Sequence, residues 1–134
     1  MNARAILVCL IFFIGLHAGT ARSAESIELQ IKKIAEETSK SLPMKVNQDI
    51  QATSMAAAGK MLMQKYNFTR GKSTIKNLPS LKIEFYNNAI NGLCTHPGFQ
   101  NLFRGGASIT HEYYDSSNQF VMQYMIDANA CTKR

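Results

Sequence analysis

The chain has 134 residues, the length of one domain, and 18% of them are charged, with a formal net charge of +6. Its basic residues are mostly scattered rather than clustered and interleaved with aromatic residues, which excludes the usual pattern of a nucleic-acid-binding protein. Six of them lie between residues 60 and 82. A solvated loop explains this group, and a basic loop that contacts an acidic partner is the alternative.

The first 23 residues have the three-part pattern of a secretory signal peptide. Arg4 supplies the positive start, an apolar run covers Ala5 to Leu16, and small or polar residues follow as far as Ser23. The run of about 12 residues is shorter than the roughly 17–25 of a membrane span, so an uncleaved anchor is the weaker alternative. We therefore expect an exported protein, periplasmic or secreted, with one domain over residues 24–134 and no stable membrane insertion after cleavage.

In chain order, the first predicted element is a helix over residues 25–41, with Ser23 as its candidate N-cap. Its apolar residues recur at spacings of three and four, which places them on one stripe (Ile27, Ile31, Ile34, Ala35 and Thr38). Two strands, 45–57 and 61–68, follow and predict a β-hairpin around a glycine-containing turn. Residues 69–78 are polar and basic and predict a loop.

The second half of the chain predicts two helices and another hairpin. Apolar residues on a wide stripe predict a helix over 79–93 that is buried on two sides. A shorter helix begins at Thr95 or His96 and ends at Gly105. Alternating residues predict strands over 107–114 and 119–127, joined by four turn-forming residues.

This element order, α-β-β-α-α-β-β, predicts the α+β class. We expect an antiparallel sheet of about four strands, made of two hairpins, with helices packed on one face.

Two cysteines, Cys94 and Cys131, remain after signal cleavage. An even number of cysteines in an exported chain predicts a disulfide, here between the end of the helix 79–93 and the end of the last strand. The chain-entropy model gives such a bond about 4 kcal/mol of stabilisation. The alternative is that Cys94 is a nucleophile with His96 or His111 as its base, which requires a free thiol.

The sequence predicts no catalytic residue, no bound cofactor and no metal site. His111, Glu112 and Asp115 are metal-ligating residue types, but His111 and Glu112 are adjacent on a predicted strand and point to opposite faces. His96 precedes Pro97 and is explained as the start of a helix.

Four residues are candidate contacts with a protein partner. Arg70 and Lys72 lie in the basic loop, and Tyr113 and Tyr114 lie on a predicted strand, where they could form an aromatic surface with Tyr124 of the neighbouring strand. Packing between strands is the alternative for the tyrosines.

Several short motifs along the chain together suggest a family. They are Leu42-Pro43 with Val46 and Asp49, Cys94 with Pro97, Gly106-Ala107 with Ile109, Tyr113-Tyr114-Asp115, and Cys131 near the end. Over residues 26–131 this pattern resembles small exported proteobacterial proteins that include the quorum-sensing-regulated virulence factors. The resemblance implies an exported α+β protein with a disulfide and carries over no catalytic residue. The family's usual glycine in the last hairpin turn is replaced here by Ser116-Ser117.

These observations lead to the hypothesis of a non-enzymatic exported protein, associated with virulence or the cell envelope, that acts by binding another macromolecule. Two alternatives stay open. One is an inhibitor or immunity-type protein that blocks a toxin or lytic enzyme through a protruding loop, either 69–78 or 115–118. The other is a small hydrolase or thiol enzyme.

Overall fold

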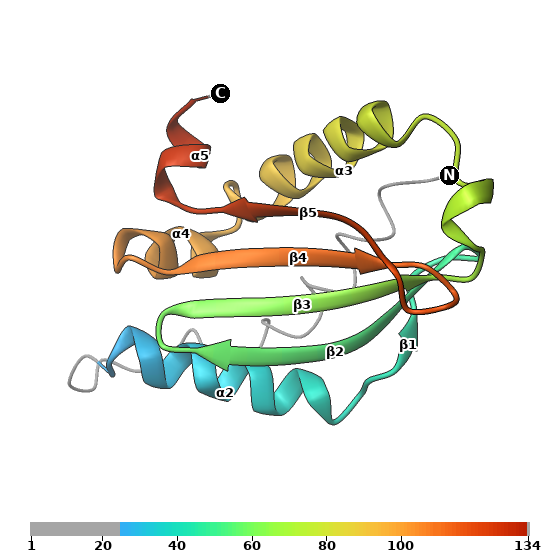
Figure 1. Ribbon diagram of the computed structural model, residues 1–134. Coiled ribbons are helices and arrows are strands. Elements are labelled where there is room, and N and C mark those ends of the chain that lie inside the picture. Colours follow the sequence, from blue (N-terminus) through green and yellow to red (C-terminus); the bar gives the residue numbers. More distant parts are fainter. Residues whose placement is uncertain (1–24, 134) are drawn as a thin grey trace.

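The computed structural model describes residues 25–133 and shows one mixed sheet with helices packed against it (Figure 1). The predicted signal peptide, residues 1–23, lies outside the described residues. The elements in chain order are α2 (Ile27–Ser39), β1 (Met44–Lys45), β2 (Ile50–Ala58), β3 (Met61–Phe68), a 3₁₀ helix (Lys72–Thr74), α3 (Leu78–Leu93), α4 (Pro97–Arg104), β4 (Ser108–Tyr114), β5 (Phe120–Ile126) and α5 (Ala128–Thr132).

The sheet has five strands in the order β1-β2-β3-β4-β5. Both predicted hairpins are confirmed, because β2 pairs antiparallel with β3 and β4 pairs antiparallel with β5. The prediction of a wholly antiparallel sheet of four strands is wrong, because β3 and β4 are parallel in the register Met61↔Ser108 to Asn67↔Tyr114. The two helices α3 and α4 between these strands make a crossover connection, and such a connection allows two strands to run in the same direction.

The fifth strand arises because the predicted strand 45–57 is divided in two. β1 pairs with the start of β2, in the register Met44↔Ala52, around a tight turn. In this turn the Val46 N–H donates to the Ile50 carbonyl at 2.9 Å, and the Asn47 side chain accepts from Asp49 N–H at 2.8 Å. Asparagine and aspartate favour such turns, so the chain reverses where strand alternation alone predicts a continuous strand.

Helix α2 lies along β2 and buries Ile31, Ala35 and Thr38, which confirms the predicted stripe. Its N-cap is Ser26, whose hydroxyl accepts from Leu29 N–H at 3.3 Å. The helix therefore begins later than predicted, and Ser23 lies outside the described residues.

Helix α3 begins with a proline in its first turn, which suits a position without a helical hydrogen-bond donor. Phe85 is 2% exposed, and its ring centroid lies 6.4 Å from that of Phe68 and 5.2 Å from that of Tyr113. Ile83, two residues earlier, is 61% exposed. The prediction that this helix is buried on two sides is wrong, because the side that carries Ile83 is exposed.

One face of the sheet is covered by helices, as predicted. Side chains on this face are buried, among them Tyr66, Phe68, Ile109 and Tyr113. Helix α3 contacts them through Phe85, while α2 lines a small void with Ala52 and Tyr66 on the same face. The other face of the sheet carries the alternate side chains, most of which remain partly or fully exposed.

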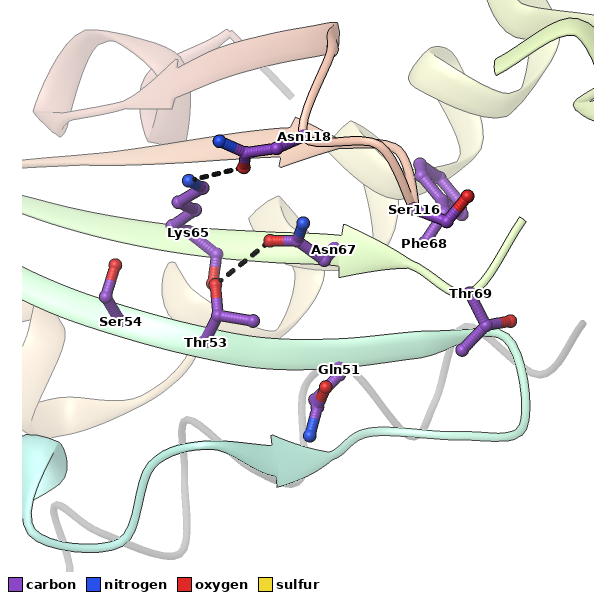
Figure 2. Close-up of a pocket in the computed structure, with 9 residues that line it drawn as sticks. All are labelled: Gln51, Thr53, Ser54, Lys65, Asn67, Phe68, Thr69, Ser116 and Asn118. Atoms are coloured by element: carbon purple, nitrogen blue, oxygen red, sulfur yellow. Dashed lines mark hydrogen bonds between the residues drawn. The ribbon is translucent and has the colours of Figure 1, made fainter. Parts of the chain in front are cut away.

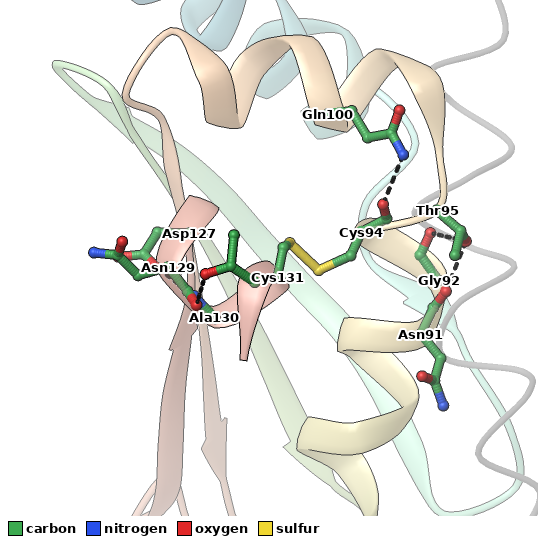
Figure 3. The surroundings of a disulfide bond; sticks show 10 residues. Asn91, Gly92, Cys94, Thr95, Gln100, Asp127, Asn129, Ala130 and Cys131 are labelled. Carbon is green, nitrogen blue, oxygen red and sulfur yellow. Dashed lines mark hydrogen bonds between the residues drawn. A yellow bond between two sulfur atoms is a disulfide. The ribbon is translucent and has the colours of Figure 1, made fainter. Parts of the chain in front are cut away.

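The disulfide between Cys94 and Cys131 is present, with their Cα atoms 5.5 Å apart (Figure 3). Cys94 is the C-cap of α3, as predicted. Cys131 lies in α5 rather than at the end of a strand, because Asp127 caps a final helical turn by accepting from Ala130 N–H at 2.9 Å. The bond therefore joins the crossover helix α3 to the segment that follows β5.

We predict that replacing both cysteines, Cys94→Ser with Cys131→Ser, lowers the free energy of unfolding by about 4 kcal/mol, since the bond restricts a long loop in the unfolded chain. Urea unfolding of the mature protein measures this change. A reductant should destabilise the wild-type protein to a similar degree and leave the double variant unchanged. Equal stability of the oxidised wild-type protein and the double variant would contradict the prediction.

Candidate functional site

The candidate site lies on the face of the sheet opposite α2 and α3, which we call the open face. The strand registers place its side chains in rows across the sheet. The row nearest the loops that follow β3 and β4 is Lys45–Gln51–Asn67–Tyr114–Phe120, and the next row is Ser54–Lys65–Glu112–Gln123. The third row is Ala56–Met63–Thr110–Met125. The row nearest the β2–β3 turn is Ala58–Met61–Ser108. The open face is thus polar at its loop end and mostly apolar at its turn end.

A hollow of about 700 Å³ lies at the loop end, and we call it the loop-end hollow (Figure 2). Except for one phenylalanine, its lining residues are polar, and one of them is a cation; they are Gln51, Thr53, Ser54, Lys65, Asn67, Phe68, Thr69, Ser116 and Asn118. The register between β2 and β3 shifts between Ala52 and Ser54, which makes Thr53 an extra residue. Such a bulge bends the strand, and here it brings two successive residues, Thr53 and Ser54, into the lining.

Hydrogen bonds fix the side chains of this lining. The Lys65 amine donates to the Asn118 side-chain oxygen at 2.9 Å and lies 4.2 Å from the centre of the Tyr114 ring, which its charge favours. The Thr53 hydroxyl donates to the Asn67 side-chain oxygen at 3.2 Å, and the Asn67 amide donates to the Asp115 carbonyl at 3.2 Å. The lining is therefore held in place before any ligand binds.

The two loops beside the hollow are joined through Asp115. Its carboxylate accepts from the backbone N–H groups of Ser117 and Gln119, each at 2.8 Å, and from Lys72 N–H at 2.9 Å. The bond from Gln119 is the strongest of the influences that hold the pKa of Asp115 below its usual value. Since its carboxylate accepts from backbone donors of both segments, Asp115 orders the loops 69–78 and 115–118.

Asn118 takes the left-handed conformation in the last hairpin turn, with a φ of 62°. Asparagine tolerates this region better than most residues. It therefore provides the backbone geometry for which glycine is usual, although Ser116-Ser117 precedes it.

Three of the four predicted partner contacts lie at the surface near the hollow. Arg70 is exposed and lies 3.8 Å from the Asp49 carboxylate, and the exposed Lys72 amine donates to the Phe120 carbonyl at 3.1 Å. Tyr114 is partly exposed beneath Lys65. Tyr113 has 0% exposure, so its predicted contact with a partner is wrong. It faces the helices because neighbouring strand residues point to opposite faces.

A buried polar cluster lies under Tyr113 on the covered face. The Tyr124 hydroxyl lies 3.0 Å from His111 Nδ1 and 3.1 Å from the Tyr113 hydroxyl, and the Tyr66 ring stacks on Tyr113 at 4.8 Å. Burial raises the pKa of both Tyr113 and Tyr124 and lowers that of His111 to about 3. All three side chains are therefore uncharged at neutral pH, and His111 is too deeply buried to meet a substrate.

The positions of Cys94 and His96 in the structure give both residues structural roles in place of the nucleophile and base considered above. Cys94 is bonded to Cys131 and has no free thiol for a nucleophile, and His96 caps α4 by accepting from Gly98 N–H at 3.2 Å. Within residues 25–133, no group of three or more His, Cys, Asp or Glu side chains is arranged to hold a metal ion.

Sequence reasoning did not single out Lys65, Asn67 and Asn118 as functional residues. The signal for the first two is the alternation in β3, where they occupy the face opposite Tyr66 and Phe68. Nothing in the local sequence places Asn118 beside Lys65, because that proximity depends on the parallel pairing of β3 with β4.

Comparison with known proteins identifies the family. The family model described as "Putative quorum-sensing-regulated virulence factor" matches residues 21–132. The chain belongs to this family. No curated protein matches the chain significantly.

Three solved structures share the fold of this chain. A "putative secreted protein" of Pseudomonas aeruginosa is 21% identical, with 81% of this chain and 99% of that chain covered and a TM-score of 0.63. The type 2 secretion system pilotin EpsS of Vibrio vulnificus is 15% identical, with coverage of 78% and 91% and a TM-score of 0.65. The type II secretion system pilotin AspS of Vibrio cholerae is 14% identical, with coverage of 78% and 92% and a TM-score of 0.59.

Among the helices of residues 25–133, none combines the length and the apolar character needed to cross a membrane.

We predict that His111 makes the protein less stable at acidic pH. Its folded pKa of about 3 lies below the value of about 6.5 in an unfolded chain, so protonation favours unfolding. As the pH falls from 6.5 toward 3, the wild-type protein should lose stability relative to His111→Gln by up to about 1.4 kcal/mol per pH unit. Urea unfolding of both proteins at several pH values measures this difference, and a constant difference would contradict the prediction.

Proposed function

We propose that the protein is an exported, non-catalytic binding protein whose loop-end hollow contacts a protein partner. The observation that carries this proposal is the hollow itself, a preorganised depression at the end of a sheet face that no helix of residues 25–133 covers. Amide and hydroxyl groups such as those of Gln51, Thr69 and Ser116 can hydrogen-bond to a polypeptide, and Lys65 adds a charge-assisted contact.

Export is supported by two features of the chain and by its relatives. The predicted signal peptide directs secretion, and the disulfide suits an oxidising compartment. The family description names a virulence factor, one solved neighbour is described as secreted, and two others are pilotins of secretion systems. A periplasmic or secreted location agrees with all of these.

The positions of the reactive groups support a binding role over the thiol-enzyme alternative. Cys94 is bonded, His111 is buried, and Asp115 is occupied by backbone donors. The inhibitor alternative requires a loop that protrudes by itself. Here the loops 69–78 and 115–118 are joined, since Ser116 N–H donates to the Arg70 carbonyl at 3.0 Å, and together they border a hollow.

Site-specific photo-crosslinking in the native host tests this proposal. A photoreactive benzoylphenylalanine at Ser116, exposed in the hollow, should give a discrete protein adduct, identified by mass spectrometry. The same residue at Glu84, exposed on α3 away from the open face, is the matched control and should not give that adduct.

The position and the nature of the adduct decide the outcome. An adduct that forms equally well from Ser116 and Glu84, or no protein adduct from Ser116, would overturn the proposal. Turnover of a substrate by the purified wild-type protein that Arg70→Ala or Lys72→Ala, changes beside the hollow, abolishes would overturn the non-catalytic assignment.

A further inference from the structure

We infer that the partner contributes a segment that is both acidic and apolar and that lies along β3 over the open face. The apolar residues of this segment cover the turn end of the face, and its carboxylates lie toward the loop end. This inference rests on the proposed function and adds the chemistry of the partner. It involves residues outside the hollow, above all Met63 and Met125.

The first observation is a group of apolar side chains on the open face, which we call the methionine strip. It consists of Met61, Met63 and Met125, with Ala56 and Ala58 beside them on β2. Met125 is 48% exposed, the alanines are exposed, and the other two methionines are partly exposed. The uncovered face of a sheet is usually polar, so an apolar strip there is a candidate contact surface.

Methionine suits this role because its unbranched side chain adapts to the shape of a partner. The flanking alanines leave space above β2, so a ligand can reach the methionine side chains from that side. Thr110 stands between Met63 and Met125 in the same row and is partly exposed.

The second observation is the charge on the loop end of the same face. Lys45, Lys65 and Lys72 form no ion pair with another described residue, and the amines of Lys65 and Lys72 are held by uncharged oxygens, those of Asn118 and of the Phe120 backbone. The amines of Lys65 and Lys72 are therefore positioned by uncharged groups, and the charge of Lys72 also interacts with the Asp115 carboxylate.

Two carboxylates lie near these cations and offset part of their charge. Glu112 is the cross-strand neighbour of Lys65, yet its carboxylate accepts from the Tyr114 hydroxyl at 3.2 Å. Asp115 is buried under its three backbone donors. The three lysines exceed these two carboxylates by one positive charge, since Arg70 is paired with Asp49, and a carboxylate is the complementary group for that excess.

The dimensions of the face fix the arrangement of the partner segment. Successive rows are two residues apart along a strand, about 6.6 Å, so the four rows span about 20 Å. Lys65 is one row from Met63, about 6.6 Å along β3, so neighbouring residues of one bound segment can reach both side chains. A single segment can therefore contact both halves. A second copy of the chain fits less well, since it would bring another net positive charge to a positive surface.

The test uses benzoylphenylalanine at Gln123, which is exposed on β5 in the same row as Lys65 and next to the methionine strip. The tagged, exported full-length protein is crosslinked in the native host, and the adduct is digested and sequenced. We expect the crosslinked peptide to contain both carboxylate and apolar residues.

Two substitutions with matched controls on α3 separate the two halves of the face. Met63→Ser and Lys65→Gln should each lower the adduct yield about five-fold or more. Ile83→Ser and Lys82→Gln remove the same kinds of group from exposed positions of α3 and should change the yield less than two-fold. Thermal unfolding checks that all four variants are folded. In envelope extracts, raising the salt concentration should lower the adduct yield of the wild-type protein more than that of Lys65→Gln.

Several results would overturn the inference. One is a crosslink to a second copy of the chain, to lipid or to glycan. Another is a crosslinked peptide without carboxylates. A third is that the control substitutions on α3 lower the adduct yield as much as the substitutions on the open face. An adduct from Ser116 without one from Gln123 would overturn this inference and leave the proposed function standing. Loss of both adducts would overturn both.

Discussion

The parallel pairing of β3 with β4 is the constraint on which the rest of the structure depends. It requires the chain to return to the same end of the sheet between Phe68 and Ser108, and α3 and α4 make that return on the face already covered by α2. Aromatic side chains such as Phe85 and Tyr113 then form the core on that face. The described helices leave the opposite face uncovered, and the loops that follow the two parallel strands meet at one end.

The disulfide and the buried polar cluster strengthen this arrangement from two sides. The bond from Cys94 to Cys131 ties the crossover to the segment after β5, so the outer hairpin is covalently attached to the helix that packs on it. The hydroxyls of Tyr113 and Tyr124 and the Nδ1 atom of His111 are hydrogen-bonded to one another in the interior, while His111 Nε2 has no hydrogen-bond partner among the described residues. Buried polar groups that are paired in this way favour one packing arrangement of β4 and β5 over alternatives.

The elements that depend on local sequence could be predicted, and those that depend on distant pairing could not. Periodicity located α2, β3 and α4, because an amphipathic pattern is a local property. The same alternation is compatible with either direction of the central pairing, so the sequence did not reveal that β3 and β4 are parallel. The burial of Tyr113 and the meeting of Lys72 with Asp115 both follow from that pairing, and for this reason the candidate site was only partly recognised.

The extra residue in β2 has a consequence for the whole family. Thr53 widens the strand at the hollow, so the depression is shaped by the path of the backbone, while Gln51, Ser54 and Asn67 supply only its chemistry. Because bulges are retained within families while surface side chains vary, relatives can keep the same depression and line it differently. The shape of the depression and the chemistry of its lining could then change independently of each other.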